Sequence, residues 1–254
     1  MTNTLDSLLS MTRALGEPAL DYVIIGEGNT SMRIDDESFY VKASGHQMRN
    51  ISEAGFVAVR LAPMLAMLDD PPHTLSEQKR ITASAVLPSN FSGDGPSPSI
   101  EVSFHAMLLR ECDVAFIGHT HPTAINQILC SEQAADFAFK RRFPDEVVLC
   151  GPRSALVPYA DPGLPLAILM RERARAYMEE FGEAPKLILL ENHGLIALGD
   201  SPAEILNITA MAVKAARIHL GALLTGKPTY LPDEEAQHIY RRPDEVYRRN
   251  LFAE

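Results

Sequence analysis

The sequence predicts one α/β domain. The chain has 254 residues, which is long enough for one large hydrophobic core and short for two domains. Short apolar runs that are typical of buried strands alternate with longer segments of helical periodicity. Hydrophobic residues make up 46% and charged residues 22%, as in ordinary soluble globular proteins. We therefore expect a single domain over residues 1–254, with a C-terminal tail from about residue 227.

The N-terminal part of the chain predicts a helix, a hairpin and short connecting elements. Leucines at near-helical spacing indicate an amphipathic helix over residues 6–15. Strands are expected at residues 22–25, 32–34, 38–41 and 56–61, and the second and third of these form a hairpin. Helices are expected at residues 63–68 and 77–86. Glycine, proline and serine then indicate a loop over residues 88–98.

The C-terminal part alternates strands and longer helices. Strands are expected at residues 114–117, 146–149, 155–158, 187–190 and 195–198. Helices are expected from Glu101, at residues 132–140, from the turn at 161–163 to about residue 181, and from residue 201 to about 224. The last helix opens with Ser201-Pro202-Ala203-Glu204, a capping box with proline at the first helical position.

Two turns rich in glycine and small polar residues flank the hairpin. They read Gly-Glu-Gly-Asn-Thr-Ser at 26–31 and Ala-Ser-Gly at 43–45. The backbone amides and short side chains of such turns can cradle an anion, although most such clusters are only turns. If both turns face one pocket, that pocket suits an anionic ligand.

Three histidines stand where predicted strands end. The first run, 114–117, leads into His119-Thr120-His121, and 187–190 is followed by His193. Side chains on a strand alternate between faces, so His119 and His121 point the same way and can share one metal ion. With His193 they would give three protein ligands and one open position, as in catalytic zinc sites. The alternative is a pair of hydrogen-bonded core histidines, because the His-x-His pattern is short.

Glu101 and His105 lie one helical turn apart. On one face of a helix, this spacing allows the helix to present a carboxylate to the metal centre. His105 could line the same site, support it from behind or belong to the core.

The overall charge and the cysteines narrow the partners and the compartment. The formal net charge is −10 and the isoelectric point is near 5.3, which argues against nucleic acid or an anionic membrane as a partner. We expect a small-molecule substrate. Three widely spaced cysteines indicate reduced thiols in a cytoplasmic protein. We expect no signal segment in the first thirty residues and no apolar run of membrane-spanning length.

Five motifs in order resemble the class II aldolase/adducin family. They are G-E-G-N-T-S at 26–31, A-S-G at 43–45, P-S-I-E with His105 at 98–105, G-H-T-H-P at 118–122 and E-N-H-G at 191–194. The family includes fuculose-phosphate and rhamnulose-phosphate aldolases, epimerases, dehydratases, some sugar-acid decarboxylases and the non-enzymatic adducin heads. The resemblance implies a three-layer α/β/α fold with a central, mainly antiparallel sheet, and often a homotetramer with sites between subunits.

The resemblance also implies roles for individual residues. His119, His121 and His193 would bind a divalent ion, Zn²⁺ by ligand type, with Mn²⁺ or another divalent ion as alternatives. Glu101 would be the acid/base residue. The substrate phosphate would be gripped by Asn29, Ser44, Gly45 and Ser99.

Some positions depart from this pattern or leave it open. Ile100 stands where the aldolases carry a second serine, so phosphorylation of the substrate is an open question. Lys42 could add to the anion grip or be a solvated strand lysine. The tail is too polar to pack on its own subunit alone, so Tyr240 and Tyr247 could reach a neighbouring subunit, or they could be ordinary packing residues.

The expected reaction is metal-assisted retro-aldol cleavage of a sugar or sugar-phosphate ketose through a metal-stabilised enediolate, with Glu101 moving the proton. Decarboxylation of a 3-oxo sugar acid would form the same kind of enolate. Epimerase and dehydratase reactions are further alternatives. A non-catalytic adducin-like interaction module is the alternative from another class.

Overall fold

The computed structural model describes residues 4–88 and 96–253, so most of the loop expected at 88–98 lies outside the described residues. Its strands are β1 Asn29–Arg33, β2 Ser38–Lys42, β3 Phe56–Arg60, β4 Phe116–Thr120, β5 Ala155–Val157, β6 Leu187–Leu190 and β7 Gly194–Gly199. They form one seven-stranded sheet of order β3-β2-β1-β4-β7-β6-β5. Every neighbouring pair is antiparallel except β5 and β6, so the expected mainly antiparallel sheet is confirmed.

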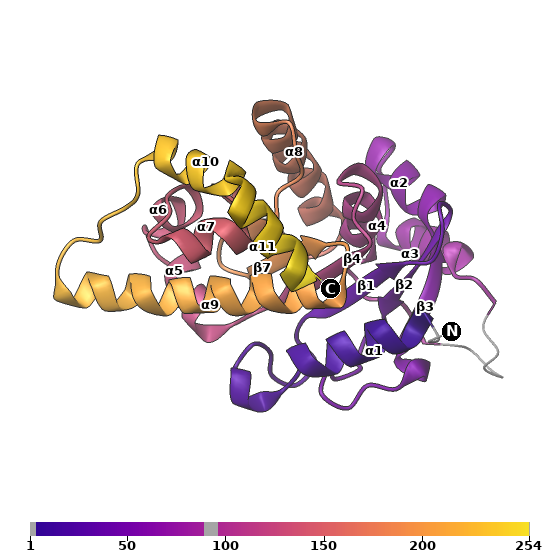
Figure 1. Cartoon of the computed structure of the whole chain (residues 1–254). Helices are drawn as coiled ribbons and strands as arrows, with labels where there is room; N and C mark the ends of the chain where they lie inside the picture. Colours follow the sequence, from indigo (N-terminus) through magenta and orange to yellow (C-terminus); the bar gives the residue numbers. More distant parts are fainter. Residues whose placement is uncertain (1–3, 89–95, 254) are drawn as a thin grey trace.

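Helices cover both faces of this sheet (Figure 1). One face carries α2 Leu61–Asp69, α3 Leu75–Ala85, α4 Val102–Glu111 and α8 Leu164–Phe181. The other carries α1 Thr4–Leu15, α5 Thr123–Leu129, α6 Ala134–Phe139, α7 Pro144–Cys150 and α9 Pro202–Thr225. A separate apolar core lies on each side, which is the predicted three-layer α/β/α arrangement.

The predicted hairpin is present, and its first strand begins earlier than expected. β1 pairs with β2 through Ser31 and Val41, and β1 also pairs with β4 through Asn29 and His119. The second pairing draws Asn29 into the sheet, although its polar sequence is typical of a turn. This register places the end of the first glycine-rich turn directly beside the histidine strand.

The strand expected at residues 22–25 is wrong. Ile24 and Ile25 are 60% and 78% exposed, and Ile25 has a left-handed backbone with φ of 52°. The chain turns here, because the amide of Glu27 donates to the carbonyl of Ile24. An apolar run therefore stands on the surface, near the end of β4, where the amide of His121 donates to the carbonyl of Tyr22.

The strand expected at residues 146–149 is also wrong, because α7 occupies this segment. Pro144 stands at the start of the helix with Asp145 and Glu146 in the first turn, which is a favourable helix N-terminus. Val147 and Val148 are fully buried, but against the C-terminal tail and not in the sheet. Helix α5 has no counterpart among the predicted elements.

The two long predicted helices are confirmed. α8 ends at Gly182, which adopts a left-handed backbone. α9 begins at Ser201, whose hydroxyl accepts from the amide of Glu204. By length and composition α9 could cross a membrane, which the sequence analysis did not anticipate. Its buried residues, including Ile205 and Ile208, pack in the core beside β4 and β7, so α9 is the core helix of this layer.

The C-terminal tail forms α10 Asp233–Arg241 and α11 Pro243–Ala253. The expectation that it is too polar to pack on its own subunit is wrong. Ala236, Ile239 and Tyr240 are buried in a small cluster with Val147 and Val148 of α7. These three residues share one face of a helix whose other faces are charged, so a low overall hydrophobicity hides an apolar stripe.

Candidate metal centre

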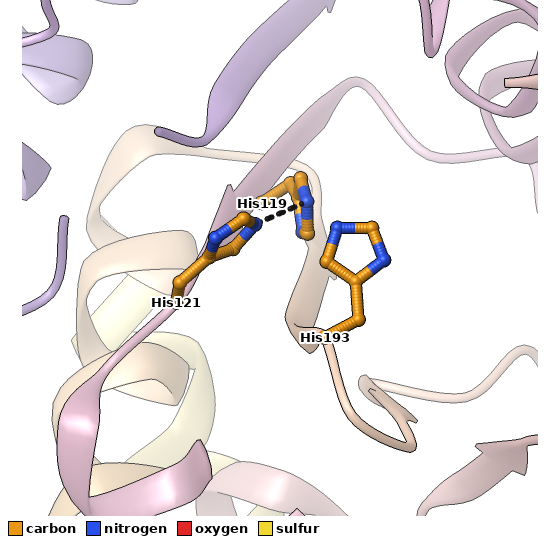
Figure 2. A group of neighbouring side chains, drawn as sticks. All are labelled: His119, His121 and His193. Atoms are coloured by element: carbon orange, nitrogen blue, oxygen red, sulfur yellow. Dashed lines mark hydrogen bonds between the residues drawn. The ribbon is translucent and has the colours of Figure 1, made fainter. Parts of the chain in front are cut away.

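Two of the three predicted metal ligands meet at the end of β4. His119 lies within the strand and is fully buried, and His121 follows one residue beyond its end. As strand alternation predicts, both side chains lie on the same side of the chain, and their Nε2 atoms are 2.9 Å apart (Figure 2). Two nitrogens on a tetrahedral zinc ion are about 3.3 Å apart, so this spacing is close to that of a shared ion.

His193 approaches the same point from the turn between β6 and β7 (Figure 2). Asn192 has a left-handed backbone with φ of 56°, and the amide of Asn126 on α5 donates to the carbonyl of His193 at 2.9 Å. One ring nitrogen from each of the three histidines lies within 4.8 Å of the others. Residues 72 positions apart in the chain are therefore brought to one point.

Two glycines permit this close approach. A side-chain carbon at Gly194 would lie 2.5 Å from the carbonyl oxygen of Thr120 and 2.7 Å from the His121 ring. At Gly28, which has a φ of 68°, it would lie 2.5 Å from the carbonyl oxygen of His119. Gly28 and Gly194 therefore each let another chain segment pass against the end of β4.

The environment keeps the imidazoles neutral. Burial lowers the pKa of His119 to about 3 and that of His121 to about 2, and the neighbouring imidazole of His193 adds to both effects. Burial also lowers the pKa of His193, against the attraction of Glu101. Neutral imidazole is the form that binds metal.

Glu101 completes the group from the N-terminus of α4. Its Oε2 lies 3.5 Å from Nε2 of His119, and its Oε1 lies 3.5 Å from Nε2 of His193. Burial raises the pKa of Glu101, opposed by the hydrogen bond from Asn29 and by the charges of His193 and Lys42. Its Oε1 is buried and has no hydrogen-bond partner among the described residues. An orphaned carboxylate oxygen beside three neutral ring nitrogens fits a divalent cation.

The residues expected to grip an anion lie next to Glu101. The amide of Asn29 donates to Ser99 Oγ at 3.1 Å and to Glu101 Oε2 at 2.7 Å. The turn at 43–45 adjoins this group, because the amide of Ser44 donates to the carbonyl of Ser97. Ser44 and Gly45 are exposed, as is Ile100 at 66%. Polar donors and one exposed isoleucine thus stand beside the carboxylate.

Lys42 is not the solvated strand lysine that the sequence allowed. It is only 3% exposed, and its Nζ makes one long hydrogen bond, 3.5 Å to the carbonyl of Ala43. Burial lowers the pKa of Lys42, while the charge of Glu101 raises it. This burial was not predicted, because lysine is rarely buried and Lys42 stands at the last position of its strand.

The remaining predicted residues lie away from the three histidines. His105 is fully buried behind Asn29, where it contacts Asn29 and Ser31. Tyr240 is 7% exposed in the cluster with α7, so it does not present its ring to a neighbouring subunit, whereas Tyr247 is 66% exposed.

A cavity of about 370 Å³ adjoins the candidate metal centre at His121. It is lined by His121, Asp21 and Glu27, and by Gln127 and Cys130 of the α5 region. This wall and α5 were not predicted, because α5 follows Pro122 without a side-chain cap and therefore lacks the usual helix-start signal.

Residues 7–220 match the model of the class II aldolase and adducin N-terminal domain. The chain belongs to this family. A 3-oxo-tetronate 4-phosphate decarboxylase of Haemophilus influenzae is 25% identical over 223 residues, covering 87% of this chain and 89% of that protein. An uncharacterised oxidoreductase of Bacillus subtilis, YuxG, is 25% identical over 229 residues, which cover 84% of this chain and 30% of YuxG. This chain therefore spans less than a third of that relative's length.

Among solved structures, an L-fuculose 1-phosphate aldolase has the same fold, with a TM-score of 0.70. The likeness covers 94% of this chain and 95% of that one, at 20% identity. The similar proteins thus include an aldolase and decarboxylases.

Proposed function

We propose that this chain is a metal-dependent lyase that cleaves a carbon–carbon bond next to the carbonyl group of a small polyhydroxylated substrate. The supporting observation is that Glu101 lies 3.5 Å from both His119 and His193. Such chemistry needs a group that stabilises negative charge beside a group that moves a proton. A divalent ion held by the three histidines, Zn²⁺ by ligand type or Mn²⁺ as an alternative, supplies a Lewis acid for the substrate oxygens.

Glu101 is the proton carrier in this proposal. Bond cleavage leaves an electron pair on the carbon next to the carbonyl, and that carbon must take a proton before the product departs. Burial favours the protonated carboxyl, while the Asn29 amide favours the carboxylate. These opposing influences suit a group that takes up a proton and returns it.

The substrate's anionic group, a phosphate or a carboxylate, binds at Lys42, at the hydroxyl of Ser99 and at the Ser44-Gly45 turn, while the amide of Asn29 holds Ser99 in place. The buried ammonium of Lys42 supplies the donor that Ile100 lacks. The cavity beside His121 is lined by Asp21 and Glu27. Acidic side chains disfavour an anion there, so the uncharged hydroxylated end of the substrate extends into that cavity.

Retro-aldol cleavage and decarboxylation both fit this site. In the first, the hydroxyl group on the departing carbon gives its proton to Glu101 as the carbon–carbon bond breaks, and an aldehyde is released. In the second, a 3-oxo acid loses CO₂, and both leave an enolate for Glu101 to protonate. Decarboxylation is favoured by the Haemophilus influenzae relative, a decarboxylase whose match covers 89% of its length. Epimerase and dehydratase reactions need further acid/base groups that these residues do not supply.

A substrate panel tests the proposal. Purified protein loaded with Zn²⁺ or Mn²⁺ is incubated with ketoses and 3-oxo sugar acids, each phosphorylated and free, while aldehyde and CO₂ are both measured. We expect turnover of at least one anionic substrate, and loss of that turnover on chelation. Protein that binds no metal and turns over nothing would contradict the proposal and favour a non-catalytic interaction module.

We further propose that the enzyme acts in the cytoplasm as a homotetramer. Ile24 and Ile25 are exposed next to the candidate centre, and Leu224 at the end of α9 is 89% exposed. Contiguous exposed apolar surface often marks a subunit interface, and Ile24 and Ile25 are adjacent in the chain. Tyr247, exposed on α11, is the tail residue that could approach a neighbouring subunit.

A further inference from the structure

A row of four buried polar side chains leads from the candidate metal centre into the sheet. Glu101 accepts a hydrogen bond from the amide of Asn29. The Oδ1 atom of Asn29 contacts Nε2 of His105, and Nδ1 of His105 lies 2.7 Å from Oγ of Ser31. The four side chains are at most 5% exposed, so water does not compete for these bonds.

The direction of every hydrogen in this row follows from the amide of Asn29. Its Nδ2 atom lies within hydrogen-bond distance of both Glu101 Oε2 and Ser99 Oγ, so the NH₂ group is the part of the amide that faces Glu101. Oδ1 of Asn29 therefore faces His105, and Nε2 of His105 must carry the hydrogen that it donates. Nδ1 of a neutral imidazole then accepts from the hydroxyl of Ser31.

We propose that His105 is a positioning residue that holds the Asn29 amide with both N–H donors toward Glu101 and Ser99. His105 does so by donating a hydrogen bond from its Nε2 to Oδ1 of Asn29. The two orientations of an amide have nearly the same shape, so packing around Asn29 does not choose between them. In the reversed orientation Oδ1 would face the carboxylate of Glu101, and Ser99 would lose the donor at 3.1 Å.

The neighbouring elements hold His105 in place for this task. His105 is fully buried on α4, and its ring lies against the ring of Phe104, with 4.5 Å between the centroids. Asn29 is fixed by the pairing of β1 with β4, where it stands opposite His119. The fold thus sets the backbone positions of His105 and Asn29. The orientation of the Asn29 amide is then determined by its hydrogen bond with His105.

Nitrogen NMR of the imidazoles tests the hydrogen directions without any substrate. In protein with labelled histidine, the His105 signals are identified by their absence in H105Q. We expect a neutral ring with the hydrogen on Nε2, in metal-free and metal-loaded protein alike. A ring with the hydrogen on Nδ1 alone would overturn the proposal.

A double-mutant cycle tests the consequence for catalysis, which rests on the proposed function. H105L should lower kcat by roughly 10–100-fold with unchanged metal content, as is common for groups that orient a reacting residue. In an N29A background the same change should cost less than about twofold, because His105 acts only through Asn29. Equal losses in both backgrounds would overturn the proposal.

Two further variants separate positioning from packing. H105Q keeps a donor near the Nε2 position and should recover most of the turnover that H105L loses. S103A alters the same helix at a fully buried hydroxyl that has no hydrogen-bond partner among the described residues, and it should leave turnover unchanged. If H105L does not fold, H105Q and the NMR measurement still decide. An inactive wild type would instead count against the proposed function, and the imidazole tautomer would still test His105.

Discussion

Nδ1 of His119 lies 2.9 Å from the carbonyl oxygen of Leu195. The contact joins β4 to β7, and the hydrogen that Nδ1 donates leaves the Nε2 lone pair directed toward His121. The acceptor is backbone that strand pairing already fixes, so Nε2, the candidate ligand atom of His119, is oriented before any ion binds. Strand pairing in the sheet therefore fixes the orientation of the His119 ring.

Removing either of two histidines should empty the metal site. H119A and H193A each leave two imidazoles, and we expect metal content, measured by mass spectrometry, to fall sharply while circular dichroism is unchanged. H238A, at an exposed histidine, is the matched control and should retain full metal content. Full occupancy in both site variants would remove these residues from the centre.

Replacing the carboxylate should separate chemistry from metal binding. E101Q keeps the shape and volume of the side chain but removes the proton acceptor, so kcat should fall by about 10²–10⁴-fold with metal retained. E179Q changes an exposed glutamate in the same way and should have no effect on kcat. Undiminished turnover in E101Q would exclude Glu101 from proton transfer.

Replacing Lys42 should weaken substrate binding without lowering the stability of the fold. A buried ammonium with one hydrogen bond of 3.5 Å costs folding free energy. We therefore expect K42M to be at least as stable as wild type in urea unfolding, while its KM for the anionic substrate rises about tenfold or more. A K42M protein with unchanged KM would show that the anion binds elsewhere.

Local rules in the sequence account for part of the centre. His119 and His121 were predicted to meet because strand alternation involves only neighbouring residues. The burial of Lys42 could not be predicted in this way, because it depends on segments more than fifty residues distant. The same holds for Asn126, whose bond to His193 requires the packing of α5 against the β6–β7 turn.

The mistaken elements have a common cause. Residues 22–25 and 146–149 are apolar runs of about four residues, too short for periodicity to distinguish strand, helix and surface loop. In the second run, Pro144 and the acidic residues after it were the decisive signal for α7. The prediction for the tail was wrong for a related reason. The mean composition of the tail is polar and hides the apolar stripe formed by Ile239 and Tyr240.

The two tail tyrosines should behave differently. Y240A removes a ring that is 93% buried between α7 and Arg249, so it should lower the free energy of unfolding by about 3 kcal/mol. Y247A should leave the stability of the subunit unchanged. If Tyr247 contributes to a neighbouring site, Y247A should lower turnover in a protein that sediments as a tetramer. A fully active monomer would exclude a shared site.

His219 should make stability depend on pH. It is fully buried in α9 beside Phe137, and neither ring nitrogen has a hydrogen-bond partner among the described residues. Burial lowers the pKa of His219, and the charge of Arg142 lowers it further, against the attraction of Glu146 and Asp136. The folded protein therefore holds this ring neutral at pH values where the unfolded chain binds a proton.

The sign of the effect follows from that difference. Below about pH 6.5 the unfolded chain takes up a proton that the folded protein does not, so His219 costs up to about 1.4 kcal/mol of stability per pH unit. H219L removes the imidazole that takes up this proton in the unfolded chain. In urea unfolding, the stability of H219L relative to wild type should therefore increase as the pH falls from 7.5 to 5.5. Because the other buried histidines are present in both proteins, their contributions cancel in the comparison. A difference that stays constant over this range would show that His219 binds a proton equally well in the folded protein.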